Sequence, residues 1–153
     1  MNEEKLRIGV IGVGYLGRFH ALKYAAMDDV QLVGVADRDQ LRARTVAEEC
    51  SAKPFTEYQS LLEHVDAVSI VVPTLFHHAV AADCLEHGID ILLEKPMTTS
   101  LAEADRLLAL AEARRAIGNL REAPSTPTDL NEPLERALAP FDAWVTGRKR
   151  FQG

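Results

Sequence analysis

The chain has 153 residues, of which 47% are hydrophobic and 26% charged, and its formal net charge is −6. This composition is typical of one globular domain with a sizeable core, and its negative charge gives no attraction to nucleic acid or to an anionic membrane surface. No apolar run approaches the roughly 20 residues of a membrane span, and the acidic start is unlike a signal peptide, so we expect a cytoplasmic protein.

The first apolar run, Leu6–Ile11, ends in Gly12-x-Gly14-x-x-Gly17, and a helix-like segment follows. In a dinucleotide-binding turn Gly12 permits the tight turn, Gly14 lets the backbone approach a pyrophosphate, and Gly17 lets the helix pack closely on the strand. The next apolar run closes at Asp37, about 20 residues further on, where a carboxylate can bind both hydroxyls of a ribose. Strand, helix and acid together predict a dinucleotide-binding βαβ unit; the alternative is a glycine turn without a ligand.

Strand-like runs and helical patterns alternate along the chain as far as residue 117. The expected elements, in chain order, are a strand at Leu6–Ile11, a helix at Tyr15–Met27, a strand at Val30–Ala36, a helix at Arg38–Cys50, a strand at Lys53–Phe55, a helix at Tyr58–Glu63, a strand at Asp66–Val72, a helix at Phe76–His87, a strand at Ile89–Leu93 and a helix at Leu101–Ile117. Gly88 is placed to end the fourth helix, and Ser100 with Glu103 forms a capping box before the fifth, which ends near Gly118.

This alternation predicts an α/β fold: a doubly wound parallel sheet of Rossmann type with strand order 3-2-1-4-5. In such a sheet ligands bind beyond the carboxyl ends of the strands where the strand order reverses. We therefore expect a ligand crevice at the ends of the first and fourth strands.

The fourth strand is followed by Pro73-Thr74-x-x-His77. Thr74 can hydrogen-bond a ribose or phosphate there, and His77 can bond the ribose or the substrate. The alternative is that Thr74 caps the next helix and His77 is an ordinary first-turn residue.

The fifth strand is followed by Glu94-Lys95-Pro96. Lys95 would project over the crevice, hydrogen-bond a substrate hydroxyl and stabilise the alkoxide that develops during hydride transfer. The alternative is a solvated lysine beside a proline that opens a helix.

Asp37 and Arg38 determine the expected cofactor. Asp37 repels a 2′-phosphate and favours NAD, whereas Arg38 can stack on the adenine or pair with a 2′-phosphate. The pattern favours NAD and leaves NADP open.

Other residues that often carry chemistry are expected to be structural. The adjacent His77 and His78 point apart on a helix, which gives no metal site without a third ligand. Cys50 and Cys84 lie far apart in the sequence and are expected to be free buried thiols. His20 is expected to be a polar helix residue without a role.

Together these motifs resemble the N-terminal domain of the Gfo/Idh/MocA family of oxidoreductases. The matching segments are IGVIGVGYLGRFHA, LVGVADRD, VDAVSIVVPTLFHH and GIDILLEKPMTTSLAEADRLLALAE. The resemblance implies NAD(P)-dependent oxidation or reduction of a hydroxyl on a sugar, nucleotide sugar or cyclitol, with Lys95 and His77 as catalytic residues. From the motifs and the resemblance together, the expected cofactor-binding residues are Gly12, Gly14, Tyr15, Leu16, Gly17, Asp37, Arg38, Pro73, Thr74, His77, Glu94 and Lys95.

The composition changes at Gly118, so we expect a dinucleotide-binding domain over residues 1–118 and an irregular linker and tail over 119–153. Pro133–Ala139 is compatible with a short helix, and residues 141–146 are apolar enough to add a strand to the open edge of the sheet. The segments EPLERAL and WVTGRKRFQ resemble part of the phosphoadenylyl-sulfate and adenylyl-sulfate reductases. The alternative is a basic tail that docks on the sheet domain.

Members of the Gfo/Idh/MocA family continue after this region into a sixth strand and a second α/β domain that completes the substrate site. We therefore expect the dinucleotide-binding part of a truncated or fused oxidoreductase, weak or inactive by itself. Its expected partners are a nicotinamide dinucleotide, a sugar or nucleotide-sugar substrate, and a second copy through the open sheet edge. The alternatives are a dinucleotide-binding module without catalysis, in a recombined or designed scaffold, and a remnant of a sulfonucleotide reductase.

Overall fold

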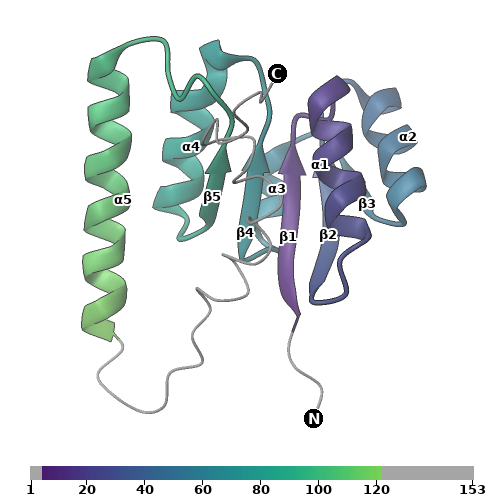
Figure 1. Ribbon diagram of the computed structural model, residues 1–153, viewed down its shortest axis with the longest axis horizontal. Helices are drawn as coiled ribbons and strands as arrows, with labels where there is room; N and C mark the ends of the chain where they lie inside the picture. Colours follow the sequence, from purple (N-terminus) through teal and green to yellow (C-terminus); the bar gives the residue numbers. More distant parts are fainter. Residues whose placement is uncertain (1–4, 122–153) are drawn as a thin grey trace, which may run out of the picture.

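The computed structural model describes residues 5–121, which form a parallel sheet flanked by helices (Figure 1). The strands are β1 (Leu6–Ile11), β2 (Val30–Ala36), β3 (Lys53–Phe55), β4 (Ala67–Ile70) and β5 (Asp90–Leu93). Their order across the sheet is β3-β2-β1-β4-β5, and every pairing is parallel. The predicted α/β fold and strand order are confirmed.

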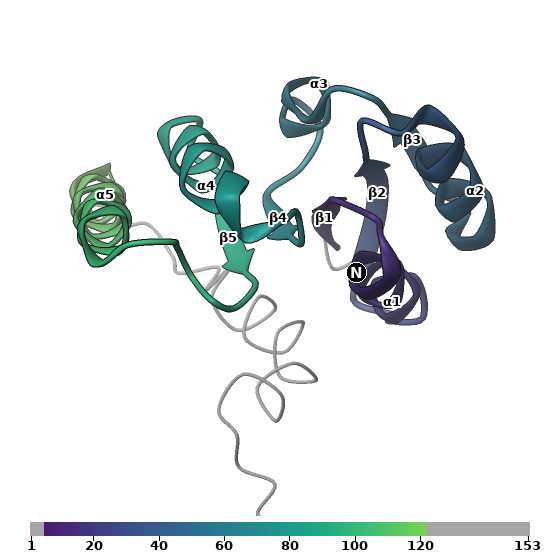
Figure 2. The same cartoon turned by 90° about the horizontal axis from the view of Figure 1, so that it is seen from above.

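The helices are α1 (Tyr15–Ala25), α2 (Gln40–Cys50), α3 (Tyr58–Leu62), α4 (His77–Glu86) and α5 (Leu101–Arg121), and a 3-10 turn, η1 (Thr74–Phe76), precedes α4. Figure 2 shows α1 and α2 on one face of the sheet, α3 and α4 on the other, and α5 beside α4. After β3 the chain crosses to the other side of β1 and continues with β4. Because the crossovers are right-handed, the helices after this point lie on the opposite face of the sheet. Over residues 5–121, none of the helices combines the length and apolar character that crossing a bilayer requires.

All five helices differ from the predicted ones at one end or both, mostly by one or two residues, and two of these differences have a clear physical reason. α2 begins at Gln40 rather than Arg38, because the Asp39 side chain accepts a hydrogen bond from the backbone N–H of Arg42 and caps the helix. α5 continues past Gly118 instead of ending there. A single glycine costs about 1 kcal/mol in a helix, less than the surrounding helix-forming residues can offset.

The change in amino-acid composition at Gly118 therefore lies within α5 and does not coincide with the end of a helix. The expected short helix at Pro133–Ala139 and the expected added strand over residues 141–146 lie outside the described residues. The segments that resemble sulfonucleotide reductases lie there too.

Apolar side chains on both faces of the sheet form the core. Leu61 of α3 is fully buried and lies so close to the sheet that a Cβ on Gly9 would approach its Cδ2 to 2.8 Å. A Cβ on Gly34 would lie 2.5 Å from Cε2 of Phe55 and 3.0 Å from Cδ1 of Leu61, so this glycine makes room for the Phe55 ring as well as for the leucine. Cys50 and Cys84 are free and buried, as predicted, and burial raises the pKa of the Cys84 thiol to about 12.

Candidate functional site

The predicted site residues gather at one edge of the sheet, where β1, β2, β4 and β5 end (Figure 1). β1 lies between β2 and β4, and the chain runs outward from it first through β2 and β3 and then, on the other side, through β4 and β5. A doubly wound sheet binds its ligands beyond the carboxyl ends of the two strands at this point, here β1 and β4. The predicted residues follow four different strands: the glycine turn after β1, Asp37 and Arg38 after β2, Pro73 and Thr74 after β4, and Glu94 and Lys95 after β5.

The glycine turn after β1 is tightly packed at two positions and open at the third. Gly12 has a φ of 86°, in the left-handed region, and a Cβ there would lie 2.8 Å from the backbone of Val71. A Cβ on Gly17 would lie 1.8 Å from the carbonyl oxygen of Gly12, so only glycine lets α1 pack against the end of β1. At Gly14 a Cβ would have no neighbour within 4 Å, and α1 begins there without a side-chain cap.

Asp37 connects the end of β2 to the glycine turn. Its Oδ2 accepts a hydrogen bond from the backbone N–H of Val13 at 3.0 Å, and its Oδ1 accepts one from the N–H of Asp39 at 2.9 Å. The guanidinium of Arg42 lies 3.4 Å from each oxygen. Since an ionised carboxylate has about four lone-pair sites, the two backbone bonds leave room for further donors.

Side chains from the loops after β2 and β4 meet at this edge. The guanidinium carbon of Arg38 lies 5.2 Å from the centre of the Phe76 ring, in a cation–π contact. Pro73 precedes η1 and Thr74 begins it. The alternative that Thr74 caps the next helix is wrong, because α4 has Phe76 at its N-cap position and no side-chain cap bond.

Apolar side chains of α1 are exposed at the same edge. Tyr15 is 85% exposed and meets Phe19 edge to face, with 5.1 Å between the ring centres. Leu16, next to Tyr15 in the chain, is half-buried. Met97, after β5, is also exposed.

His77 lies inside the protein, between the loops that follow β4 and β5. The ring is only 1% exposed. Its Nδ1 lies 2.9 Å from the carbonyl oxygen of Pro96 and 3.2 Å from that of Met97, and its Nε2 lies 2.8 Å from the carbonyl oxygen of Val72. Backbone carbonyl oxygens lie against both ring nitrogens, and a ring with one N–H donates to one side only, to Val72 or to Pro96 and Met97. His77 thus lies between the loop after β4 and the loop after β5, where it can hold their positions.

Glu94 has a partner that the sequence did not suggest. Its Oε1 lies 3.0 Å from Nε2 of His20 on α1, and its Oε2 accepts a hydrogen bond from the backbone N–H of Lys95 at 3.1 Å. His20 is 2% exposed, and this burial lowers its pKa, against the opposing effect of Glu94. Helical spacing in the sequence could have indicated this burial. His20 follows Gly17 by three residues, so both lie on the side of α1 that faces the sheet.

The burial of His20 predicts a pH dependence of stability. In the unfolded chain a histidine titrates at about pH 6.5, above its lowered pKa in the folded protein. The contribution of uncharged His20 to the free energy of unfolding is complete above pH 6.5. It is lost as the pH falls towards the pKa of His20 in the folded protein, because the unfolded chain then binds the proton more readily. For one proton the slope is at most about 1.4 kcal/mol per pH unit.

We therefore expect the decline of the unfolding free energy between about pH 6.5 and pH 5 to be shallower in His20→Gln than in the unmodified protein. Urea unfolding followed by circular dichroism at several pH values measures it. His78→Gln, which changes a partly exposed histidine, is the matched control and should keep the original slope. An identical slope in the unmodified protein and in His20→Gln would contradict the prediction.

Comparisons with known proteins agree with this geometry. Residues 6–119 match the family model GFO_IDH_MocA, described as an oxidoreductase family with an NAD-binding Rossmann fold. UDP-N-acetylglucosamine 3-dehydrogenase of Acidithiobacillus ferrooxidans is 49% identical over 119 residues, which cover 76% of this chain and 37% of that protein. Its solved structure superposes with a TM-score of 0.70, covering 74% of this chain and 37% of that one.

Two further solved structures contain a dinucleotide. GenD2 from gentamicin A biosynthesis, in complex with NAD, is 31% identical with a TM-score of 0.71, covering 74% of this chain and 33% of that one. KijD10, a 3-ketoreductase from Actinomadura kijaniata in complex with TDP-benzene and NADP, is 32% identical with a TM-score of 0.69, covering 72% and 36%. The chain thus spans about a third of the length of these relatives.

Proposed function

Because the chain belongs to the Gfo/Idh/MocA oxidoreductase family with an NAD-binding Rossmann fold, we propose that it binds a nicotinamide dinucleotide at the carboxyl edge of its sheet. The observation that carries the proposal is the open surface at Gly14, beside the start of α1 and the carboxylate of Asp37. Backbone N–H groups at the start of a helix favour a pyrophosphate. The remaining lone pairs of Asp37 suit the hydroxyls of the adenosine ribose.

The residues after β4 and β5 lie at the other end of the proposed dinucleotide site. We assign Pro73 and Thr74 to the middle of the dinucleotide, and Glu94 and Lys95 to its nicotinamide end. The nicotinamide ring supplies hydride transfer when it is bound. Lys95 is exposed, while its backbone N–H is held by Glu94, which in turn is held by His20. This arrangement suits Lys95 to hydrogen-bond the hydroxyl that is oxidised and to assist its proton.

For the whole protein we propose a sugar, nucleotide-sugar or cyclitol hydroxyl as substrate, with a nucleotide sugar favoured. The support is the 49% identity to a UDP-N-acetylglucosamine 3-dehydrogenase. Association of two copies through β5, which pairs only with β4 among the described strands, is also a proposal. Sedimentation of the full chain over a range of concentrations tests it.

Titration of the full chain with NADH, followed by the fluorescence of the dinucleotide, tests the proposed binding. We expect saturation with a Kd between about 1 μM and 1 mM, the common range of enzyme KM values. Gly14→Ala should weaken binding at least about tenfold, because its Cβ would enter the space of the pyrophosphate. Absence of saturation in the unmodified protein, or unchanged binding by Gly14→Ala, would refute the assignment of this edge.

A further inference from the structure

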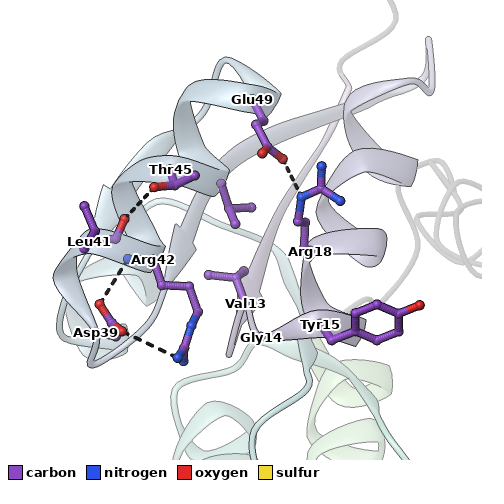
Figure 3. A pocket seen from close by; sticks show the side chains of 10 residues that line it. Val13, Gly14, Tyr15, Arg18, Asp39, Leu41, Arg42, Thr45 and Glu49 are labelled. Carbon is purple, nitrogen blue, oxygen red and sulfur yellow. Dashed lines mark hydrogen bonds and ion pairs between the residues drawn. The ribbon is translucent and has the colours of Figure 1, made fainter.

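Two polar side chains of α1 contact groups on opposite sides of the helix. Figure 3 shows Arg18 pointing across a groove of about 390 Å³ to Glu49 of α2, where its Nε lies 2.6 Å from the carboxylate. His20 follows two residues later and does not line this groove. Residues two apart on a helix point to nearly opposite sides, so His20 faces away from α2, towards the end of β5.

The backbone at the end of β5 sets the direction from which Lys95 projects. The backbone N–H of Glu94 still donates to the carbonyl oxygen of Ile70, 3.1 Å away, and so continues the pairing of β5 with β4. Lys95 lies beyond the last residue of β5, and its N–H donates instead to Oε2 of Glu94 at 3.1 Å. The side chain of Glu94 therefore takes the place of the sheet in orienting the peptide group that precedes the Cα of Lys95.

His20 holds this carboxylate in place. Its Nε2 lies 3.0 Å from Oε1 of Glu94, so the two carboxylate oxygens have different partners, the imidazole and the N–H of Lys95. An ionised carboxylate only accepts hydrogen bonds, so Nε2 of His20 is the donor. The imidazole is 2% exposed and the Glu94 side chain 15%. Because water does not readily replace a donor this well buried, the carboxylate keeps its direction.

Tyr24, one helical turn after His20, makes a different kind of contact. Its hydroxyl lies 2.7 Å from Oγ of Ser69 within β4, and both residues are fully buried. This bond connects α1 with the interior of the sheet, away from the edge where the predicted site residues gather. His20 instead contacts the residue directly before Lys95, at that edge. The same side of α1 therefore carries one polar contact to the core and one to the loop of Lys95.

We infer that His20 is a positioning residue for Lys95 and acts through the carboxylate of Glu94, without touching substrate or dinucleotide itself. The inference rests on the proposed function, since it gives a role to His20 in the same reaction that Lys95 assists. A buried imidazole costs free energy unless it is hydrogen-bonded, and here its bond goes to the residue before Lys95. Without the His20 donor, the carboxylate of Glu94 is free to turn towards water and to release the N–H of Lys95.

Proton exchange of the Lys95 amide, resolved by NMR spectroscopy of the isotope-labelled full chain at one pH, tests the inference. In His20→Leu the exchange rate should rise about three- to tenfold, as the loss of one hydrogen bond implies. In His20→Gln it should stay near that of the unmodified protein, because the amide nitrogen of glutamine lies as many bonds from Cα as Nε2 of histidine and also donates. Tyr24→Phe is the matched control: it removes a buried hydrogen bond from the same helix and should leave the Lys95 amide unchanged.

His20→Asn keeps the test decisive if His20→Leu does not fold. Its amide nitrogen lies one bond closer to Cα than that of glutamine and ends short of Oε1 of Glu94, so the Lys95 amide should exchange as fast as expected for the leucine variant. An exchange rate equal to that of the unmodified protein in either variant, or an equal rise in Tyr24→Phe, would show that His20 does not position Lys95.

Titration of the same proteins with NADH separates this inference from the proposed function. His20→Leu should bind NADH within about fivefold of the unmodified protein, because the open surface at Gly14 and the carboxylate of Asp37 are unchanged. Loss of NADH binding in His20→Leu with an unchanged Lys95 amide would overturn the inference and leave the dinucleotide site standing, since His20 then supports the glycine turn. If the unmodified protein does not bind NADH, the proposed function fails and the inference with it.

Discussion

Gly17→Ala is expected to lower the free energy of unfolding by about 3 kcal/mol or more. The new Cβ would lie 1.8 Å from the carbonyl oxygen of Gly12 and 2.9 Å from its carbonyl carbon. Both are backbone atoms, so no rotation of a side chain relieves the contact. α1 has to move away from the end of β1, and the start of the helix moves with it. Overpacking typically costs about 1–3 kcal/mol, and this contact belongs at the upper end.

Gly14→Ala is the matched control in the same turn. A Cβ at Gly14 meets nothing within 4 Å, and its φ of −64° is open to any residue. We expect the free energy of unfolding to change by less than about 1 kcal/mol, because alanine is a poorer N-cap than glycine but reduces the entropy of the unfolded chain, and the two effects oppose each other. Urea unfolding followed by far-ultraviolet circular dichroism compares the two variants. Equal stability of the Gly14 and Gly17 variants would contradict the close packing of α1 on β1.

The two variants also separate stability from binding. Gly17→Ala should lower the stability, and it should also weaken NADH binding because the start of α1 moves. Gly14→Ala should keep the fold and its stability while it loses most of its affinity for NADH. This contrast tests the glycine turn as a binding surface without a catalytic assay.

His77→Leu is expected to lower the free energy of unfolding by about 1–3 kcal/mol. Leucine is close to histidine in size, so the main loss is the hydrogen bond that the ring N–H donates to a backbone carbonyl oxygen, of Val72 on one side of the ring or of Pro96 and Met97 on the other. The ring is 1% exposed, so leucine removes this bond without letting water replace it. The loops after β4 and β5 also lose their connection.

His78→Leu serves as the control for this prediction. The residue is adjacent and carries the same side chain, but it is partly exposed. Its replacement should change the free energy of unfolding by less than about 0.5 kcal/mol. The measurement is urea unfolding of both variants at one pH. If His77→Leu is as stable as His78→Leu, the three carbonyl contacts do not stabilise the fold.

Much of this architecture follows from local patterns. Short apolar runs punctuated by glycine and proline predict the strands, and the handedness of their connections then permits few sheet orders. The glycine spacing predicts the packing at Gly12 and Gly17, because a tight turn into a closely packed helix has the same steric needs in any chain. The exact ends of α2 and α5 were less predictable, since the choice of Asp39 as cap and the passage through Gly118 depend on small energies.

The sequence by itself determined the element order, the parallel sheet and the edge where its polar motifs gather. Only the tertiary structure decided which side chains reach that edge. It buries His77 with its ring nitrogens beside three backbone carbonyl oxygens. It also pairs His20 with Glu94, which is 74 residues away in the sequence. It also places Arg42 against Asp37. Periodicity fixes the face of a helix on which a residue lies, but the partner of that residue depends on how the helix packs on the sheet, which is a property of the whole fold.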